Sequence, residues 1–208
     1  MFIIYWQESF LILKMTKIRV AFLFSNYYRP TKMYYLQWPE QFANSEIDTE
    51  FFSGTLDQNP GIGKHALVVE GKWEKFKRST YYFFKYPETS LQCLKNQQAY
   101  SLRRKIALWS EVAPLLTYQP DVIHCVNSRT SIKLLDLVFQ FRPKIIVSFR
   151  GHDTLVGPYQ DAVWRDNLQR IFEFADCLHY VSYSLRNAAI DNLGAPPEKC
   201  RVIYAGVD

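Results

Sequence analysis

Residues 148–153, with the sequence SFRGHD, place three side chains capable of chemistry around one glycine. They follow an apolar run, so these groups are expected where a strand ends. His152 can carry a proton near neutral pH, and Asp153 can orient His152 or accept a hydrogen bond from a sugar hydroxyl. Arg150 can donate two hydrogen bonds to a phosphate, and Gly151 permits a tight turn or close approach to a ligand. Two interpretations remain open: a ligand site, or a turn whose polar residues cap the next helix.

Four further residues are candidates for substrate binding: Tyr27, Arg29, Asn127 and Ser182. Asn127 ends the apolar segment 121–126, whereas His124 lies inside it and is expected to be a hydrogen-bonded core histidine. Tyr27 and Arg29 belong to the expected loop 25–30, where the Arg29 side chain could reach a phosphate. Ser182 is also suited to cap the helix that follows it.

Strands and helices alternate along the chain, and this alternation is typical of an α/β fold with a doubly wound parallel sheet. The expected strands are 17–24, 47–53, 121–126, 144–149, 176–181 and 201–204. Apolar residues at helical spacing predict helices over 102–116, 131–141, 164–175 and 183–193, with Gly194 ending the last one. Ligands of such sheets bind outside the carboxyl ends of the strands, at loops 25–30, 127–130, 150–158 and 182–184.

The segment 64–85 mixes cations with aromatic residues. It contains six Lys or Arg and two Glu, which leaves a net charge of +4 (six minus two). Cations beside aromatic rings suit an anionic membrane surface or single-stranded nucleic acid. Of these two, we expect possible membrane contact and no nucleic acid partner. A solvated basic face is the alternative. Residues 65–69 could form a strand, and 54–63 are expected to be a loop.

Composition indicates one globular domain. The chain has 208 residues, of which 48% are hydrophobic and 22% charged, and its net charge is +5. The four cysteines form no CxxC pair, so we expect a reducing compartment and no metal site. No segment is apolar enough to span a membrane. Residues 1–14 are interpreted as an extension before a natural start at Met15, with a short interfacial anchor as the alternative.

Four motifs in order resemble the N-terminal domain of family 4 (group 1) glycosyltransferases. They are PDVIH at 120–124, FADCLHYVS at 174–182, GAPPEK at 194–199 and VIYAGVD at 202–208. The resemblance is carried mostly by 119–208, fits 15–53 loosely and does not extend to 54–100. It implies a Rossmann-like domain at 15–204 that forms one half of a GT-B fold. Residues 205–208 would then begin the linker to a second domain.

The same resemblance implies function. The N-terminal half would bind the acceptor, and a C-terminal half would bind the nucleotide sugar, with retention of configuration and no metal or other cofactor. His152, Asp153 and Arg150 would be catalytic, and Gly151 would contact substrate. Members of the family commonly carry His-Gly-x-Asp, whereas this chain has Arg150 at the position of that histidine and His152 two residues later. The chain also lacks glycines in loop 25–30 and the paired glutamates of the donor half.

The sequence therefore predicts hexosyl transfer from a nucleotide sugar to a polysaccharide or glycolipid acceptor, in the cytoplasm or peripherally at the inner face of the membrane. The 208 residues alone are expected to be inactive. A second interpretation is a non-catalytic remnant or split subunit that docks a separate chain carrying the donor domain. A Rossmann oxidoreductase is disfavoured, because Gly61 and Gly63 lie in a loop and no GxGxxG follows the first strand.

Overall fold

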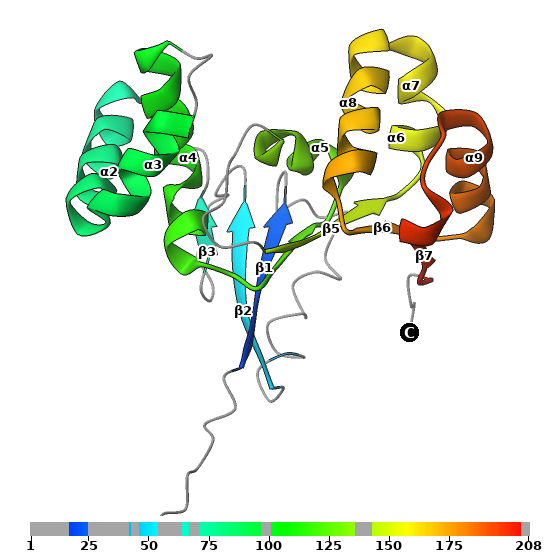
Figure 1. The fold of residues 1–208 in the computed structure, drawn as a ribbon, viewed down its shortest axis with the longest axis horizontal. Coiled ribbons are helices and arrows are strands. Elements are labelled where there is room, and N and C mark those ends of the chain that lie inside the picture. Colours follow the sequence, from blue (N-terminus) through cyan, green and yellow to red (C-terminus); the bar gives the residue numbers. More distant parts are fainter. Residues whose placement is uncertain are drawn as a thin grey trace, which may run out of the picture.

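The described part of the chain is built on one parallel sheet of seven strands. The computed structural model describes residues 17–24, 42, 46–53, 64–66, 71–96, 101–135 and 143–204. The strands lie in the order β3-β2-β1-β4-β5-β6-β7, and every neighbouring pair is parallel (Figure 1). Their bounds are β1 (Ile18–Phe24), β2 (Ile47–Ser53), β3 (Lys64–Ala66), β4 (Val122–Cys125), β5 (Lys144–Phe149), β6 (Cys177–Tyr180) and β7 (Cys200–Val202).

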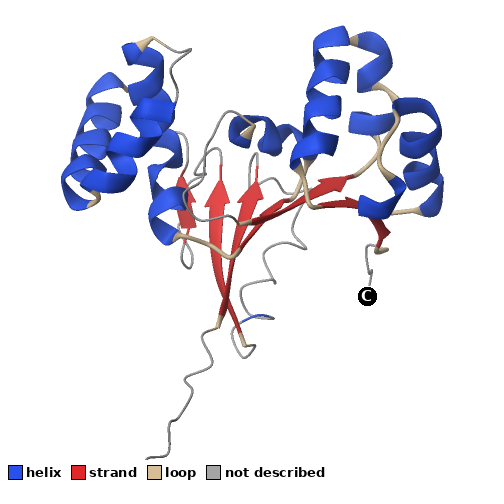
Figure 2. Ribbon diagram, viewed as in Figure 1, coloured by secondary structure: helices blue, strands red, loops and turns tan. Residues whose placement is uncertain are grey.

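The described helices form two lobes beside the sheet (Figure 1). One lobe contains α2 (Lys72–Lys85), α3 (Pro87–Asn96) and α4 (Leu102–Tyr118). The other contains α6 (His152–Leu155), α7 (Gly157–Gln160), α8 (Ala162–Phe174) and α9 (Tyr183–Leu193). Between them lie α5 (Ser128–Ser131) and the 3-10 turn η2 (Ile132–Leu134), and a second such turn, η3 (Pro197–Lys199), precedes β7 (Figure 2).

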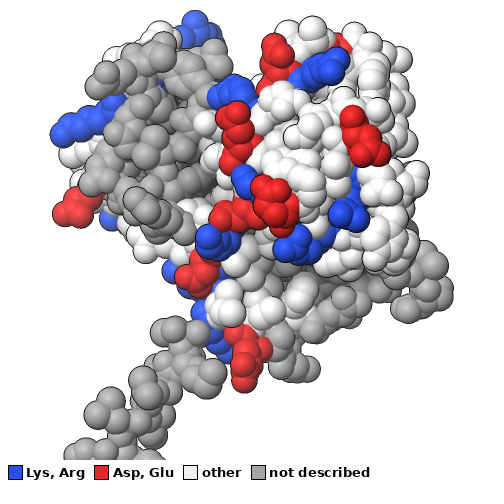
Figure 3. Space-filling model, turned by 45° about the vertical axis from the view of Figure 1, so that its right-hand side comes forward, with Lys and Arg blue, Asp and Glu red and all other residues white. Residues whose placement is uncertain are grey.

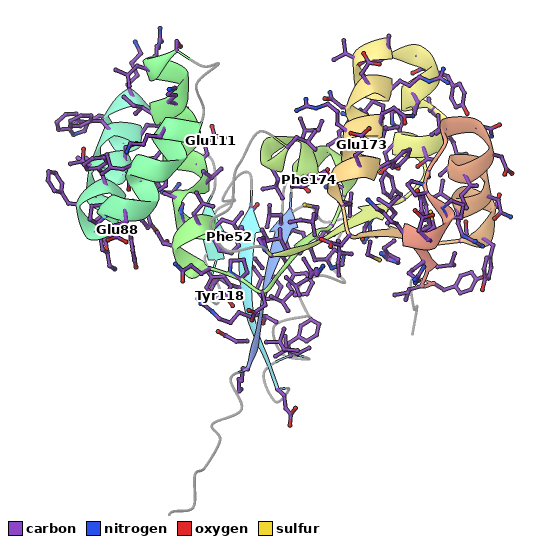
Figure 4. The ribbon with its side chains drawn as sticks, in the orientation of Figure 1. Phe52, Glu88, Glu111, Tyr118, Glu173 and Phe174 are labelled. Carbon is purple, nitrogen blue, oxygen red and sulfur yellow. The ribbon has the colours of Figure 1, made fainter. Side chains whose placement is uncertain are left out.

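Successive residues of β1 belong alternately to two hydrophobic clusters. Ala21 and Leu23 of β1 join the larger cluster, which also holds Trp109 of α4 and Leu168 of α8. Phe22 and its alternate neighbours belong to a smaller cluster with residues of β2, Val126 and Phe42. Because side chains of a strand alternate between faces, the two clusters lie on opposite faces of β1. At the lower end of α4, Tyr118 packs on Phe52 of β2, with 6.0 Å between ring centroids (Figure 4).

Most predicted elements are confirmed. The strands predicted at 17–24, 47–53 and 144–149 match β1, β2 and β5 to within a residue. The helices predicted over 102–116, 164–175 and 183–193 match α4, α8 and α9. Ser182 caps α9, because its hydroxyl accepts a hydrogen bond from the Leu185 amide at 3.2 Å. Gly194 ends that helix in the left-handed conformation, at φ 72°.

Three expectations need correction. Leu102 and Ile106 were predicted to share the buried stripe of α4, but they are 68% and 40% exposed, because the first turns of α4 extend past the sheet. The helix predicted from residue 131 begins earlier, at Ser128, as α5 with Asn127 as its cap, and it continues as the 3-10 turn η2; residues 136–141 lie outside the described residues. The strand expected at 65–69 is present as β3 but begins one residue earlier, at Lys64, and residues 67–69 lie outside the described residues.

The other expectations fall elsewhere in the chain. Loops 25–30 and 54–63, and the proposed end segments 1–14 and 205–208, lie outside the described residues. Among the helices that the structure describes, none has the length and apolar character needed to cross a bilayer.

Candidate active site at the carboxyl edge of the sheet

The candidate site forms where β4 and β5 end side by side. These strands are parallel neighbours, so the loops that follow them emerge at the same edge. The two loops are also bonded to each other, because Arg150 Nε donates a hydrogen bond to the Val126 carbonyl oxygen at 3.2 Å. The Val126 amide in turn donates to the Leu23 carbonyl of β1 at 3.0 Å. Arg150 is therefore anchored at the centre of the sheet while its side chain remains exposed.

A buried carboxylate organises the turn after β5. Oδ1 of Asp153 accepts hydrogen bonds from the backbone amides of Arg150 and Gly151, at 3.2 and 3.1 Å. Oδ2 accepts a third hydrogen bond from the Ser128 hydroxyl at 2.6 Å. Sequence analysis left two roles open for Asp153, to orient His152 or to accept a hydrogen bond from a sugar hydroxyl; in the structure its carboxylate accepts from these three donors. Asp153 is 9% exposed and thus holds the turn from within.

Gly151 gives the turn its direction. Its φ is 129°, a conformation that side-chain-bearing residues rarely adopt. The Gly151 carbonyl accepts hydrogen bonds from the amides of Thr154 and Leu155, which start the short helix α6. As a result, Arg150 and His152 are exposed on either side of Gly151, and Asp153 is buried below them.

Trp164 of α8 supports this turn from below. Its indole Nε1 donates a hydrogen bond to the Asp153 carbonyl oxygen at 3.1 Å. A methyl group at Gly157 would lie 2.8 Å from Trp164 Cδ1, so only glycine fits there. The guanidinium carbon of Arg129 lies 5.7 Å from the centre of the Trp164 ring. The helical apolar pattern indicated that Trp164 faces the core, but it did not predict the hydrogen bond from Trp164 to Asp153. The contact of Ser128 with Asp153 was also not predicted, because the only local indication of a site was the run of polar residues in the turn.

Asn127 and Ser182 serve as helix caps at this edge. Oδ1 of Asn127 accepts a hydrogen bond from the Thr130 amide at 3.1 Å, just as Ser182 caps α9. Both residues are half-buried. Tyr27 and Arg29, the other two predicted substrate-binding residues, lie outside the described residues.

A row of polar side chains crosses the sheet behind the site. His124 Nε2 lies 2.8 Å from Ser148 Oγ, Ser148 Oγ lies 2.7 Å from His179 Nδ1, and His179 Nε2 lies 3.0 Å from the Ile203 carbonyl oxygen. Burial, and then the charges of His179 and Arg150, lower the pKa of His124 to about 4. The prediction of a hydrogen-bonded core histidine is confirmed. No local pattern indicated that His124, Ser148 and His179 align across three neighbouring strands.

The described cysteines and possible metal ligands complete the survey of reactive side chains. Cys125, Cys177 and Cys200 are free thiols, and burial raises the pKa of Cys125 to about 12. Across the described ranges, no group of three or more His, Cys, Asp or Glu side chains is arranged to hold a metal ion. Acidic and basic residues are interspersed on the face drawn in Figure 3.

Comparisons with known proteins concern the family and the fold. A sequence model of glycosyltransferase family 4 matches residues 74–208. The fold is similar to that of a sucrose-phosphate synthase structure from Thermosynechococcus elongatus, with a TM-score of 0.53 and 13% sequence identity. That similarity covers 91% of this chain and 90% of the other, and at this identity it concerns the fold. The comparison with curated proteins found no match.

Proposed function

Because the chain belongs to glycosyltransferase family 4, we propose that it forms the acceptor-binding side of a retaining glycosyltransferase. Its parallel sheet is the Rossmann-like half of a GT-B fold. The reaction we propose transfers a hexosyl group from a nucleotide sugar to a polysaccharide or glycolipid acceptor. The observation that carries the proposal is the turn after β5, where a buried Asp153 holds exposed Arg150 and His152 at the carboxyl edge.

Each residue of the turn receives a role from its surroundings. Arg150 is the cation at the centre of the edge, where it would balance the charge that develops on the leaving phosphate. His152 is exposed and can exchange a hydrogen bond or a proton with a sugar hydroxyl. Asp153 is a positioning residue, because its oxygens are occupied by two amides and the Ser128 hydroxyl. Asn127 and Ser182 contribute the adjoining helix starts. We propose Tyr27 and Arg29 as further substrate-binding residues.

We further propose that a second domain, facing this edge, holds the nucleotide. The purified 208 residues would then transfer sugar slowly or not at all. Exposed apolar side chains at the edge, on α6 and α7, favour such a contact: Leu155, Val156 and Tyr159. The same surface supports the alternative of a non-catalytic subunit that docks a separate donor-domain chain. A complementation experiment distinguishes the two proposals. If the purified chain becomes active only after a protein fraction from a deletion strain is added, a separate donor-domain chain is required.

The function can be tested with radiolabelled nucleotide sugars. Extracts with membranes are prepared from cells that carry the gene and from a deletion strain, and each labelled UDP-sugar and GDP-sugar is supplied in turn. We expect one donor to label a glycolipid or polysaccharide fraction only when the gene is present. NMR of the product should show the same anomeric configuration as the donor. Equal labelling with and without the gene for every donor would exclude the proposal, and an inverted anomer would exclude the retaining mechanism.

A further inference from the structure

We propose that the outward face of α2 docks onto an anionic lipid surface. The inference goes beyond sugar transfer and can fail without it. Four large aromatic side chains of this helix point away from the protein: Trp73, Phe76, Tyr81 and Phe84 are 65%, 56%, 55% and 78% exposed. The helix has only 14 residues. Such a density of exposed aromatic surface on one short helix is typical of an interaction site.

Only part of the aromatic surface of α2 faces the domain: Tyr82 and Phe83 are half-buried, and Tyr82 packs against the main core. A helix that packs on a domain normally directs its apolar stripe inward and its charges outward. In α2 the half-buried positions include the cations Lys75 and Arg78, and the one buried residue is Ser79. Arg78 lies within electrostatic reach of Glu111 on α4, the helix against which α2 packs. Packing of α2 on the domain therefore leaves the four exposed aromatic side chains uncovered.

Lysines are placed between the exposed rings. Lys77 Nζ lies 5.7 Å from the centre of the Trp73 ring, and the Trp73 and Phe76 rings stack with 5.7 Å between centroids. Lys85 Nζ lies 2.9 Å from the Tyr81 hydroxyl. The helix carries five cations and one glutamate, so its net charge is +4 (five minus one). Side chains project from the outer side of this lobe in Figure 4.

This combination fits an anionic bilayer better than a protein surface. Trp and Tyr are favoured at the level of lipid headgroups, and lysines can extend their charges to those headgroups while their stems cover apolar surface. Protein–protein interfaces, by contrast, are depleted in lysine. A second copy of the chain would bring one net charge of +4 against another. Anionic lipid satisfies both the aromatic stripe and the charge.

Sedimentation with vesicles tests the proposal. Neutral phosphatidylcholine vesicles are compared with vesicles that also contain about one-third phosphatidylglycerol. We expect the protein to bind the anionic vesicles at least about tenfold more tightly, since each lysine near such a surface contributes roughly a fivefold increase. The double variant Trp73→Ala/Phe84→Ala and the double variant Lys77→Glu/Lys85→Glu should each lose most of this binding. Equal binding to both vesicle types would overturn the proposal.

A matched control comes from the other lobe. Tyr159→Ala/Val163→Ala removes two exposed apolar side chains there and should bind anionic vesicles as the wild type does. Thermal melts confirm that all variants are folded, which is expected because the altered α2 residues are exposed. An equal loss in the control variant would contradict the proposal. Light scattering without lipid tests the remaining alternative. A dimer that Trp73→Ala/Phe84→Ala abolishes would also contradict the proposal, because a second copy of the chain would then occupy the outward face of α2.

Discussion

Two helices of similar length, α2 and α8, place their large aromatic and aliphatic side chains differently. In α8, Asp161 caps the first turn, and Trp164, Leu168, Ile171 and Phe172 are buried against the sheet. In α2 no side chain caps the start at Gly71, and the aromatic stripe faces outward. The comparison teaches that aromatic periodicity alone does not say what a helix covers. In α8 the stripe stabilises the fold beneath the site, whereas in α2 it is left for a partner.

Replacing one tryptophan in each helix should give the largest contrast. Trp164→Ala removes a buried ring and the hydrogen bond to the Asp153 carbonyl, and it should lower the free energy of unfolding by about 3–5 kcal/mol. Trp73→Ala removes an exposed ring and should change it by less than about 0.5 kcal/mol. Urea denaturation followed by circular dichroism measures both. Similar losses in the two variants would show that the α2 stripe is part of the core.

Removing one carboxylate in each region should give the next largest contrast. Asp153→Ala leaves the Ser128 hydroxyl and two backbone amides without their acceptor, and it should cost about 2–4 kcal/mol. Glu74→Ala breaks only an exposed ion pair with Lys77, which is worth about 0–1 kcal/mol. The same denaturation experiment applies. If Asp153→Ala were as mild as Glu74→Ala, the carboxylate would not be holding the turn.

The pH dependence of stability should distinguish the sheet from the α2 lobe. Folding lowers the pKa of His124 from 6.5 to about 4, so the unfolded chain binds more protons between these values. Stability from this group is therefore complete above pH 6.5 and is lost as the pH falls toward 4, by roughly 1–2 kcal/mol because the ring is partly exposed. Denaturation at pH 7 and pH 4.5 should show a smaller drop in His124→Asn than in the wild type. An unchanged drop in His124→Asn would contradict the assignment, and Trp73→Ala should leave the drop unaltered.

The smallest effect concerns the helix starts. Ser182→Ala removes the hydrogen bond that caps α9 and should cost about 1 kcal/mol, whereas Ser182→Gly should cost only a few tenths of that. In α2 the corresponding position, Gly71, provides no side-chain cap, so its first turn should exchange amide hydrogens faster than that of α9. Hydrogen exchange measured by mass spectrometry can compare the two. Equal protection of both first turns would contradict this difference.

The second half of the chain was predictable because its local signals agree with one another. Buried parallel strands read as apolar runs, and Ser182 and Gly194 mark the ends of α9 at the positions the sequence suggests. The Rossmann-like sheet and the family assignment followed from those signals. The orientation of α2 could not be predicted in this way, because its cations and aromatic residues alternate and either side of the helix could face the domain. Only packing on α4 decides which side is covered.

Within the candidate site, the sequence identified the polar cluster but not the division of roles. Arg150, His152 and Asp153 are adjacent in the chain, yet the left-handed Gly151 separates two exposed side chains from a buried one. The donors that hold Asp153 include Ser128, which lies 25 residues away and could be found only from the pairing of β4 with β5. The pairing of β5 with both β4 and β6 aligns His124, Ser148 and His179. Tertiary contacts of this kind leave no local pattern.

The most direct test of the account is sugar transfer by site variants in the radiolabelled assay. Deletion cells are supplied with the wild-type gene, Arg150→Ala, His152→Ala or Arg165→Ala, the last being an exposed arginine on α8 outside the turn. We predict that Arg150→Ala and His152→Ala each lower incorporation by at least about 100-fold at equal protein levels, and that Arg165→Ala does not. Wild-type incorporation by both Arg150→Ala and His152→Ala would contradict the assignment of the active site to the carboxyl edge.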